Sequence, residues 1–423
     1  MINKIKTIFK DKDKKVLLEN FLSLSVLQGA NYILPLITLP YLVRVLGPEK
    51  FGLLAFAQAF VAYFGILMDY GFSFSGTREV SVHRENKDKL NEIYSSIVTL
   101  KFIIFIFSFL ILSVIIFSFN KFKEDYIVYY FTFLGFLGGI FFQSWLFQGL
   151  EKMKFITFVN LFTKILFTVS IFIFIHQMSD YIYVPLISSI GSIIGGLISL
   201  YITFKYLRIK YNLPKLKSLI FYVKDSTPLF FSQASISLFN QVNTFLGGLI
   251  FNYTLLGYYT LAEKLFIALR NLYNILFQVL YPYFSKRKFN LQEKYVKIIL
   301  IFCFLLFVIL FLSAKFLINL LYGDEYKISI EMLRIFSIIL FFSGINTLIF
   351  VLWVLTKRLY KDYFWINFSG GILNISLILI LSNFFGIFGI PISILIVEVF
   401  FILSYIRKYR YYFRKNINKN CIQ

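Results

Sequence analysis

Charged side chains inside long apolar runs are the residues of this sequence that packing explains least well. Seven charged residues lie in such runs, and five of them are basic, which favours an anionic ligand. Placing a charge at the middle of a membrane costs at least about 2.5–3.5 kcal/mol, so each needs a partner, an aqueous surface or a function. Lys101 and Arg334 lie near the ends of their runs, where we expect them to reach the headgroup region. The seven residues are Lys101, Lys164, Glu263, Lys264, Arg270, Arg334 and Glu398.

The spacing of these charges separates structural roles from binding roles. Glu263 and Arg270 are seven residues apart and can share a helix face, so a buried ion pair competes with a role in binding substrate or a proton. Lys164 follows Asn160 by one helical turn, which is a better arrangement for a cation in a cavity. The cations predicted to bind substrate are Lys164, Arg270, Lys264 and Arg44.

Polar side chains recur at helical spacing on the first, second, seventh and eighth apolar runs. Such stripes indicate two walls of a shared cavity, although direct hydrogen bonds between helices explain isolated positions equally well. The residues predicted to line the cavity or to couple transport to an ion are Gln28, Asn31, Gln58, Asp69, Asn160, Gln233, Gln241, Glu263, Asn274 and Gln278.

The elements that hold these residues must be membrane helices. The 423 residues are 59% hydrophobic and 15% charged, and the mean hydropathy of +0.76 lies outside the range of soluble domains. Because about 20 apolar residues span the hydrocarbon, the sequence predicts an all-α polytopic membrane protein with about twelve transmembrane helices. We expect them near 18–44, 51–72, 93–119, 126–149, 155–178, 182–206, 219–250, 254–282, 294–320, 331–356, 362–384 and 387–407.

Two prolines fall inside the first predicted helix. Pro35 and Pro40 each remove a backbone donor, and membrane helices keep such breaks only where neighbouring helices or water satisfy the freed carbonyls. We therefore expect this helix to be broken twice beside a cavity.

The second half of the chain repeats the first at a nearly constant offset. Residues 256–263 align with residues 51–58, Asn367 aligns with Asn160, and Pro391 aligns with Pro185. We expect two pseudo-symmetric six-helix lobes, residues 1–210 and 211–423, around a central cavity. Because six is even, the lobes should be related by an axis along the membrane normal.

The net charge of +22 sets the orientation of the chain in the membrane. Most lysines and arginines fall on one side, in the N-terminal tail, in every second loop and after Arg407. This positive-inside pattern predicts that both termini are cytoplasmic, and the excess charge should meet anionic membrane lipids. Nucleic acid is excluded as a partner because no soluble basic face exists to bind it.

Several chemistries are excluded. With two histidines and two cysteines, we expect no metal, no cofactor and no disulfide framework. The segments between the predicted helices are too short to hold a catalytic site, so the chain is predicted not to be an enzyme. Because the sequence has no GxxxxGK[ST] loop for ATP, an ion gradient or the gradient of the substrate must drive any transport.

Three segments resemble the Wzx-type flippases of O-antigen and capsule repeat units, which belong to the multidrug/oligosaccharidyl-lipid/polysaccharide exporter superfamily. They are PLITLPYLVRVLGPEKFG at 35–52, YGFSFSGTREVS at 70–81 and WLFQGLEKMK at 145–154. The resemblance implies alternating access around a cationic cavity. It also implies transfer of undecaprenyl-pyrophosphate-linked oligosaccharides from the cytoplasmic to the periplasmic leaflet of the bacterial inner membrane.

The same resemblance implies the polysaccharide polymerase and chain-length machinery as partners.

Three alternatives to this function remain. Lipid II flippases of the superfamily usually have two more helices than this length supplies, and multidrug extruders would favour acidic residues for organic cations. A membrane-embedded glycan polymerase or ligase would need larger loops.

Overall fold

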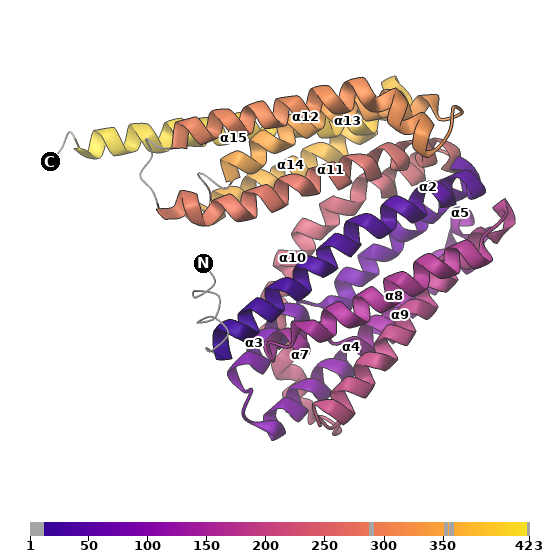
Figure 1. Ribbon diagram of the computed structural model, residues 1–423, viewed down its shortest axis with the longest axis vertical. Coiled ribbons are helices and arrows are strands. Elements are labelled where there is room, and N and C mark those ends of the chain that lie inside the picture. The colour runs from indigo at the N-terminus through magenta and orange to yellow at the C-terminus, as the bar shows by residue number, and fades with distance from the viewer. Residues whose placement is uncertain (1–11, 287–291, 351–353, 355–358, 421–423) are drawn as a thin grey trace, which may run out of the picture. The chain divides into compact units, whose positions relative to one another are not determined.

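The computed structural model describes residues 12–286, 292–350, 354 and 359–420, and the regular elements in those ranges are all helical (Figure 1). The predicted all-α fold is therefore confirmed. The chain divides into two compact units between Gln241 and Val242, inside a single helix. We describe each unit by itself, and the predicted lobe boundary at residue 210 stays a prediction.

The first unit is built from eight α-helices and part of a ninth in the described ranges. These are α2 (Lys12–Asp69), α3 (Phe72–Val82), α4 (Lys87–Ser118), α5 (Asn120–Lys123), α6 (Tyr126–Phe141), α7 (Ser144–Gly149), α8 (Met153–Phe174), η1 (Met178–Ile182), α9 (Tyr183–Tyr201), η2 (Ile202–Tyr206) and the first part of α10 (Leu216–Ile250).

The second unit continues from α10 through five more α-helices in the described ranges. These are α11 (Tyr253–Lys286), α12 (Gln292–Leu321), α13 (Lys327–Ile349), α14 (Tyr360–Phe385), η5 (Gly386–Phe388) and α15 (Gly389–Asn420).

The helices follow the predicted spans. In the described chain, eight stretches are long and apolar enough to cross a membrane. Two of them, residues 25–82 and 361–408, each contain two predicted spans. The predicted spans at 219–250 and 254–282 coincide with α10 and α11, which are not among the eight. The lengths of the apolar runs therefore predicted the positions of the helices, including the two that hold Gln233, Glu263 and Arg270.

The expectation of two breaks in the first helix is wrong. Pro35 and Pro40 lie inside α2, whose one residue with non-helical dihedral angles is Gly47. Proline has a helical φ, so it can remain in a helix when its lost hydrogen bond is tolerated. The chain instead turns at Gly47, which has φ 70°, between the first two predicted spans.

Two further interruptions lie beside the candidate site. Tyr70 and Gly71 have φ of 44° and 79°, and they separate α2 from α3. The predicted helix at 126–149 is divided into α6 and α7 by Phe142 and Gln143. The side-chain amide of Gln143 donates to the carbonyl of Ile140, which satisfies an acceptor freed at the end of α6.

Helix α4 has one exposed apolar face and one face that packs into the core of the first unit. Its exposed face is a stripe that includes Ile103, Phe107, Leu110 and Val114. Exposed apolar residues at this spacing fit contact with hydrocarbon. Its opposite face packs into an aromatic core that contains Phe72, Tyr94, Trp145 and Tyr222.

Helices α6 and α9 approach one another through small residues. A Cβ atom on Gly138 would lie 2.3 Å from the backbone carbon of Ser192. The hydroxyl of Ser192 donates to the carbonyl of Gly135 at 2.9 Å. On another face of α9, a Cβ on Gly195 would lie 2.5 Å from Thr163 of α8. The glycine at 195 is thus explained by close helix packing.

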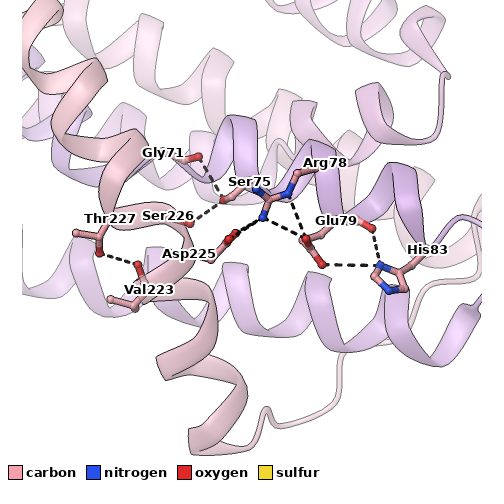
Figure 2. A network of polar contacts seen from close by, with 9 residues as sticks. All are labelled: Gly71, Ser75, Arg78, Glu79, His83, Val223, Asp225, Ser226 and Thr227. Carbon is pink, nitrogen blue, oxygen red and sulfur yellow. Dashed lines mark hydrogen bonds and ion pairs between the residues drawn. The ribbon is translucent and has the colours of Figure 1, made fainter.

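Helix α3 is clamped to the beginning of α10 (Figure 2). Arg78 donates to both carboxylate oxygens of Asp225 at 2.6 Å. The hydroxyls of Ser75 and Ser226, both buried, lie 2.7 Å apart. Because the Arg78 side chain is 53% exposed, its ion pair contributes only about 0–1 kcal/mol. The buried contacts therefore hold the clamp.

Gly71 allows the closest approach in this clamp, so we expect Gly71→Ala to destabilise the protein. A Cβ atom there would lie 2.9 Å from both Leu229 Cβ and Phe230 N. Its left-handed backbone adds strain, and the two effects together should cost about 2–4 kcal/mol. The measurement is the thermal unfolding midpoint in detergent. The control is Gly29→Ala, since nothing lies within 4 Å of a Cβ on Gly29. Equal midpoints would contradict the expectation.

Two local details recur in both halves of the chain. The amide of Asn160 donates to Ile156 O at 2.8 Å, and that of Asn367 donates to Tyr363 O at 2.8 Å. Pro185 and Pro391 are each the third residue of an α-helix that follows a short 3-10 helix. A duplication requires such recurrences, while the predicted axis between the repeats stays a prediction.

Candidate functional site

A cavity of about 290 Å³ lies between α6, α8 and α9, and we call it the Lys164 cavity. Both Lys164 and Asn160 line it, so the pair predicted from one-turn spacing does share a cavity. Its other walls are largely apolar or carry hydroxyl groups. The lining residues are Gly139, Phe142, Val159, Asn160, Thr163, Lys164, Phe167, Ser188, Gly191, Ser192 and Gly195.

The charge of Lys164 is not neutralised by any described residue. Lys164 is partly buried, and no carboxylate lines its cavity. No ion pair or hydrogen bond joins its ammonium to another residue in the described ranges. Other cations of this unit are paired, for example Arg84 with Glu151 at 2.7 Å and Lys89 with Glu92 at 2.9 Å. An unpaired, partly desolvated cation attracts anions.

Neutral donors and acceptors surround this cation. Thr163 donates to Asn160 O at 3.0 Å, which occupies its hydroxyl proton. The hydroxyl of Ser188 makes no hydrogen bond with the described residues, and Asn160 uses one amide proton on Ile156. The ammonium, the Ser188 hydroxyl and the second amide proton remain available as donors. This set suits a phosphate or carboxylate group.

A second cavity of about 290 Å³, which we call the Asp69 cavity, lies between α2 and α10, beside Gly71. It brings together Asp69, Gln233 and Gln241, three residues predicted as cavity polar groups. The hydroxyl of Ser73 donates to Asp69 Oδ1. The complete lining is Ala62, Gly65, Ile66, Asp69, Gly71, Gln233 and Gln241.

Lys101 is the residue of this region that was misassigned from the sequence. It is only 7% exposed, so the expectation that it reaches the headgroups is wrong. Helix α4 presents it to the interior of the unit, close enough to Asp69 for the two charges to interact. Arg334, by contrast, pairs with Glu331 at 2.8 Å near the beginning of α13.

Glu263 has two hydroxyl partners in the second unit. Tyr259 donates to Glu263 Oε1 at 2.7 Å, and Thr244 donates to Oε2 at 3.0 Å. Lys264 is exposed but lies close enough to interact electrostatically with this carboxylate. Each carboxylate oxygen of Glu263 thus accepts a hydrogen bond from a neutral hydroxyl group.

Arg270 is associated with a different carboxylate. It lies over the ring of Phe266 at 5.9 Å and interacts electrostatically with Glu398. Glu398 is 7% exposed and accepts a hydrogen bond from the amide of Asn346. The predicted pair of Glu263 and Arg270 is not formed among the described contacts. Glu398 was not predicted as the partner of Arg270, because α11 and α15 are far apart along the chain.

Four other predicted residues line neither cavity, namely Gln28, Asn31, Arg44 and Gln58. Asn31 donates to Gln28 at 3.2 Å, and both lie on α2. Gln58 and Arg44 are exposed on α2, and Arg44 has an interaction partner. The side chains of Asn274 and Gln278 lie outside the described residues. In the described ranges, no group of three or more His, Cys, Asp and Glu residues could hold a metal ion.

Residues 17–288 match the family described as "Polysaccharide biosynthesis protein". The chain belongs to this family. A protein from Escherichia coli K12, named "Putative O-antigen transporter", is 28% identical over 91% of this chain and 95% of its own length. A protein of the same name from Shigella dysenteriae is 28% identical over 91% of this chain and 98% of its own length.

Several solved structures share the fold of this chain at low sequence identity. "Lipid II flippase MurJ, inward closed conformation" has a TM-score of 0.70 and 16% identity, covering 91% of this chain and 87% of that one. An inward-facing multidrug resistance MATE transporter of the MOP superfamily has a TM-score of 0.65 and 13% identity, covering 92% and 96%. The fold implied by the resemblance to this superfamily is confirmed. These relatives and structures are transporters or flippases, which agrees with the prediction that the chain is not an enzyme.

Proposed function

We propose that this protein moves a lipid-linked oligosaccharide across the bacterial inner membrane. The substrate is an undecaprenyl-pyrophosphate-linked O-antigen or capsule repeat unit, transferred from the cytoplasmic to the periplasmic leaflet. Alternating access of a central cavity provides the path, and an ion gradient provides the energy. Glu263, which is half-buried, is the carboxylate that we expect to carry a coupling ion.

The unpaired Lys164 in its cavity is the observation that supports this proposal best. A pyrophosphate bears several negative charges, and a cation in a site of reduced dielectric binds such a group more strongly than in water. Arg270 can add a second cation, although Glu398 offsets part of its charge. Family membership supports the lipid-linked saccharide as the larger part of the substrate.

A multidrug extruder is an alternative function for a transporter with this fold. It would need an uncompensated carboxylate to attract organic cations. The Lys164 cavity is lined by no acidic residue, and Asp69 lies near the cation of Lys101. These charges favour the anionic lipid-linked substrate. The polysaccharide polymerase and chain-length machinery, which would receive the product, complete the proposal as partners.

Reconstituted vesicles test the proposed function. Lipid-linked oligosaccharide extracted from a host strain that lacks the gene is placed in the vesicle membrane, and a membrane-impermeant lectin reports the sugar on the outer leaflet. The protein should accelerate the appearance of sugar from the inner leaflet. Transport of organic cations without movement of this lipid would overturn the proposal in favour of multidrug extrusion.

The charge distribution gives a separate prediction about topology. Reporters fused after Gln423 should behave as cytoplasmic, and reporters inserted at Gly47 should behave as periplasmic, because the basic loops remain inside. Alkaline phosphatase and fluorescent protein fusions measure the two sides. A periplasmic reporter signal after Gln423 would contradict the even number of spans.

A further inference from the structure

The Asp69 cavity differs from the Lys164 cavity in its charge. Asp69 is close to Lys101, which is 7% exposed, so a buried cation offsets the carboxylate. No other charged residue lines the cavity. A site with this balance offers little to a phosphate, which the carboxylate repels, and little to a cation, which Lys101 repels.

The polar groups of the Asp69 cavity have unused hydrogen-bonding capacity. The side-chain amides of Gln233 and Gln241 form no hydrogen bonds with the described residues. Asp69 Oδ1 accepts from Ser73, while Oδ2 accepts from no described residue. Each amide can donate and accept, and the carboxylate oxygen can accept. These half-buried polar groups are therefore free to bind water or a polar ligand.

This combination matches a neutral ligand with several hydroxyl groups. A hydroxyl both donates and accepts, so a carboxylate oxygen and two amides can each bind one. The volume of about 290 Å³ is close to the lower end of small-molecule sites, about 300–1,000 Å³.

We propose that the Asp69 cavity binds hydroxyl groups of the sugar residues of the substrate, whereas the Lys164 cavity binds its phosphate. This inference rests on the proposed function. Lys101 is then a positioning residue, whose nearby charge holds the Asp69 carboxylate in place as an acceptor. The two cavities divide recognition between the variable glycan and the constant lipid phosphate.

Binding to the full-length protein in detergent tests this division with two probes. The probes are undecaprenyl pyrophosphate without sugar and the lipid-linked oligosaccharide extracted from the gene-deleted host. Asp69→Asn and Gln233→Ala should each weaken binding of the glycosylated lipid about tenfold, because a polar group of the site or the ligand is left unpaired. Neither variant should change binding of the sugar-free lipid. Lys164→Ala should weaken binding of both.

The controls separate local effects from folding. Asp125→Asn alters a carboxylate of the same unit that accepts from Tyr181 at 2.7 Å, away from the Asp69 cavity, and it should bind both lipids normally. Lys101→Met should weaken binding of the glycosylated lipid alone. Combined with Asp69→Asn, it should add nothing, since no carboxylate is left to position. Thermal midpoints of all variants are measured beside the affinities.

The outcomes distinguish this inference from the proposed function. If the wild-type protein binds neither lipid, the proposed function fails. If it binds both and the Asp69 and Gln233 variants retain affinity for the glycosylated lipid, the sugar assignment alone is overturned. Loss of both lipids in well-folded Asp69 variants would also overturn it, because the cavity would then bind the phosphate.

Discussion

Lys164→Ala should reduce transport of the lipid-linked oligosaccharide about 10- to 100-fold at matched membrane abundance. The reason is the loss of a charged donor, which contributes about 1.5–3 kcal/mol to a hydrogen bond with its ligand. Lys164→Arg should retain most of the activity because it keeps the charge, although the fork geometry of arginine differs. The measurement is restoration of surface polysaccharide in a strain that lacks the gene, followed by the vesicle assay.

Lys154→Ala is the matched control for this prediction. Lys154 lies on the same helix, α8, is exposed and sits over the ring of Phe155 at 5.7 Å. It does not line the Lys164 cavity, so its loss should leave transport nearly unchanged. If Lys164→Ala exports normally while the protein is present at the wild-type level, Lys164 does not bind the phosphate.

Arg270 provides an internal comparison. Its charge is already opposed by Glu398, so Arg270→Ala removes one partner of an existing interaction as well as a cation. We expect a smaller effect on phosphate binding than for Lys164→Ala. Glu398→Gln should restore part of the function of Arg270→Ala, because it removes the carboxylate that would remain uncompensated.

Helix positions could be predicted from the sequence, whereas the exact interruptions could not. Apolar length alone defines a span, because every backbone group in lipid must be bonded within the helix. Whether a proline breaks a helix depends on its surroundings, and Pro35 and Pro40 do not break α2. Gly47 and Gly71, where the chain does turn, have positive φ. The predicted spans 18–44 and 51–72 end close to both turns, but the sequence did not show which residues adopt a positive φ.

The candidate site was partly predictable for a related reason. Helical spacing correctly placed Lys164 beside Asn160, because both lie on one helix. It could not show that Asp69 lies near Lys101 on α4, or Arg270 near Glu398 on α15. Those pairs depend on which helices are neighbours. The excess of basic residues in the spans suggested an anionic ligand, but the structure was needed to show which cation is unpaired.

The second large expected effect is a loss of stability on substitution of Gly138, in the helix α6 that forms one wall of the Lys164 cavity. We expect Gly138→Ala to destabilise the protein by about 3–5 kcal/mol, through overpacking and weakened hydrogen bonds between α6 and α9. The added Cβ atom would lie 2.4 Å from Ser192 O and 2.3 Å from its carbonyl carbon. Both are backbone atoms, so no rotamer change can relieve the clash. The helices would have to separate, which would stretch the bond from Ser192 Oγ to Gly135 O.

The neighbouring glycine is the control, since nothing lies within 4 Å of a Cβ on Gly139. Gly139→Ala should stabilise α6 by about 0.5–1 kcal/mol, because alanine loses less backbone entropy than glycine on forming a helix. Thermal unfolding midpoints in detergent should therefore move in opposite directions for the two variants. Because Ser192 lines the Lys164 cavity, residual Gly138→Ala protein should also bind the sugar-free lipid more weakly. Equal midpoints would show that α6 and α9 are farther apart than described, and that the cavity between them has a different shape.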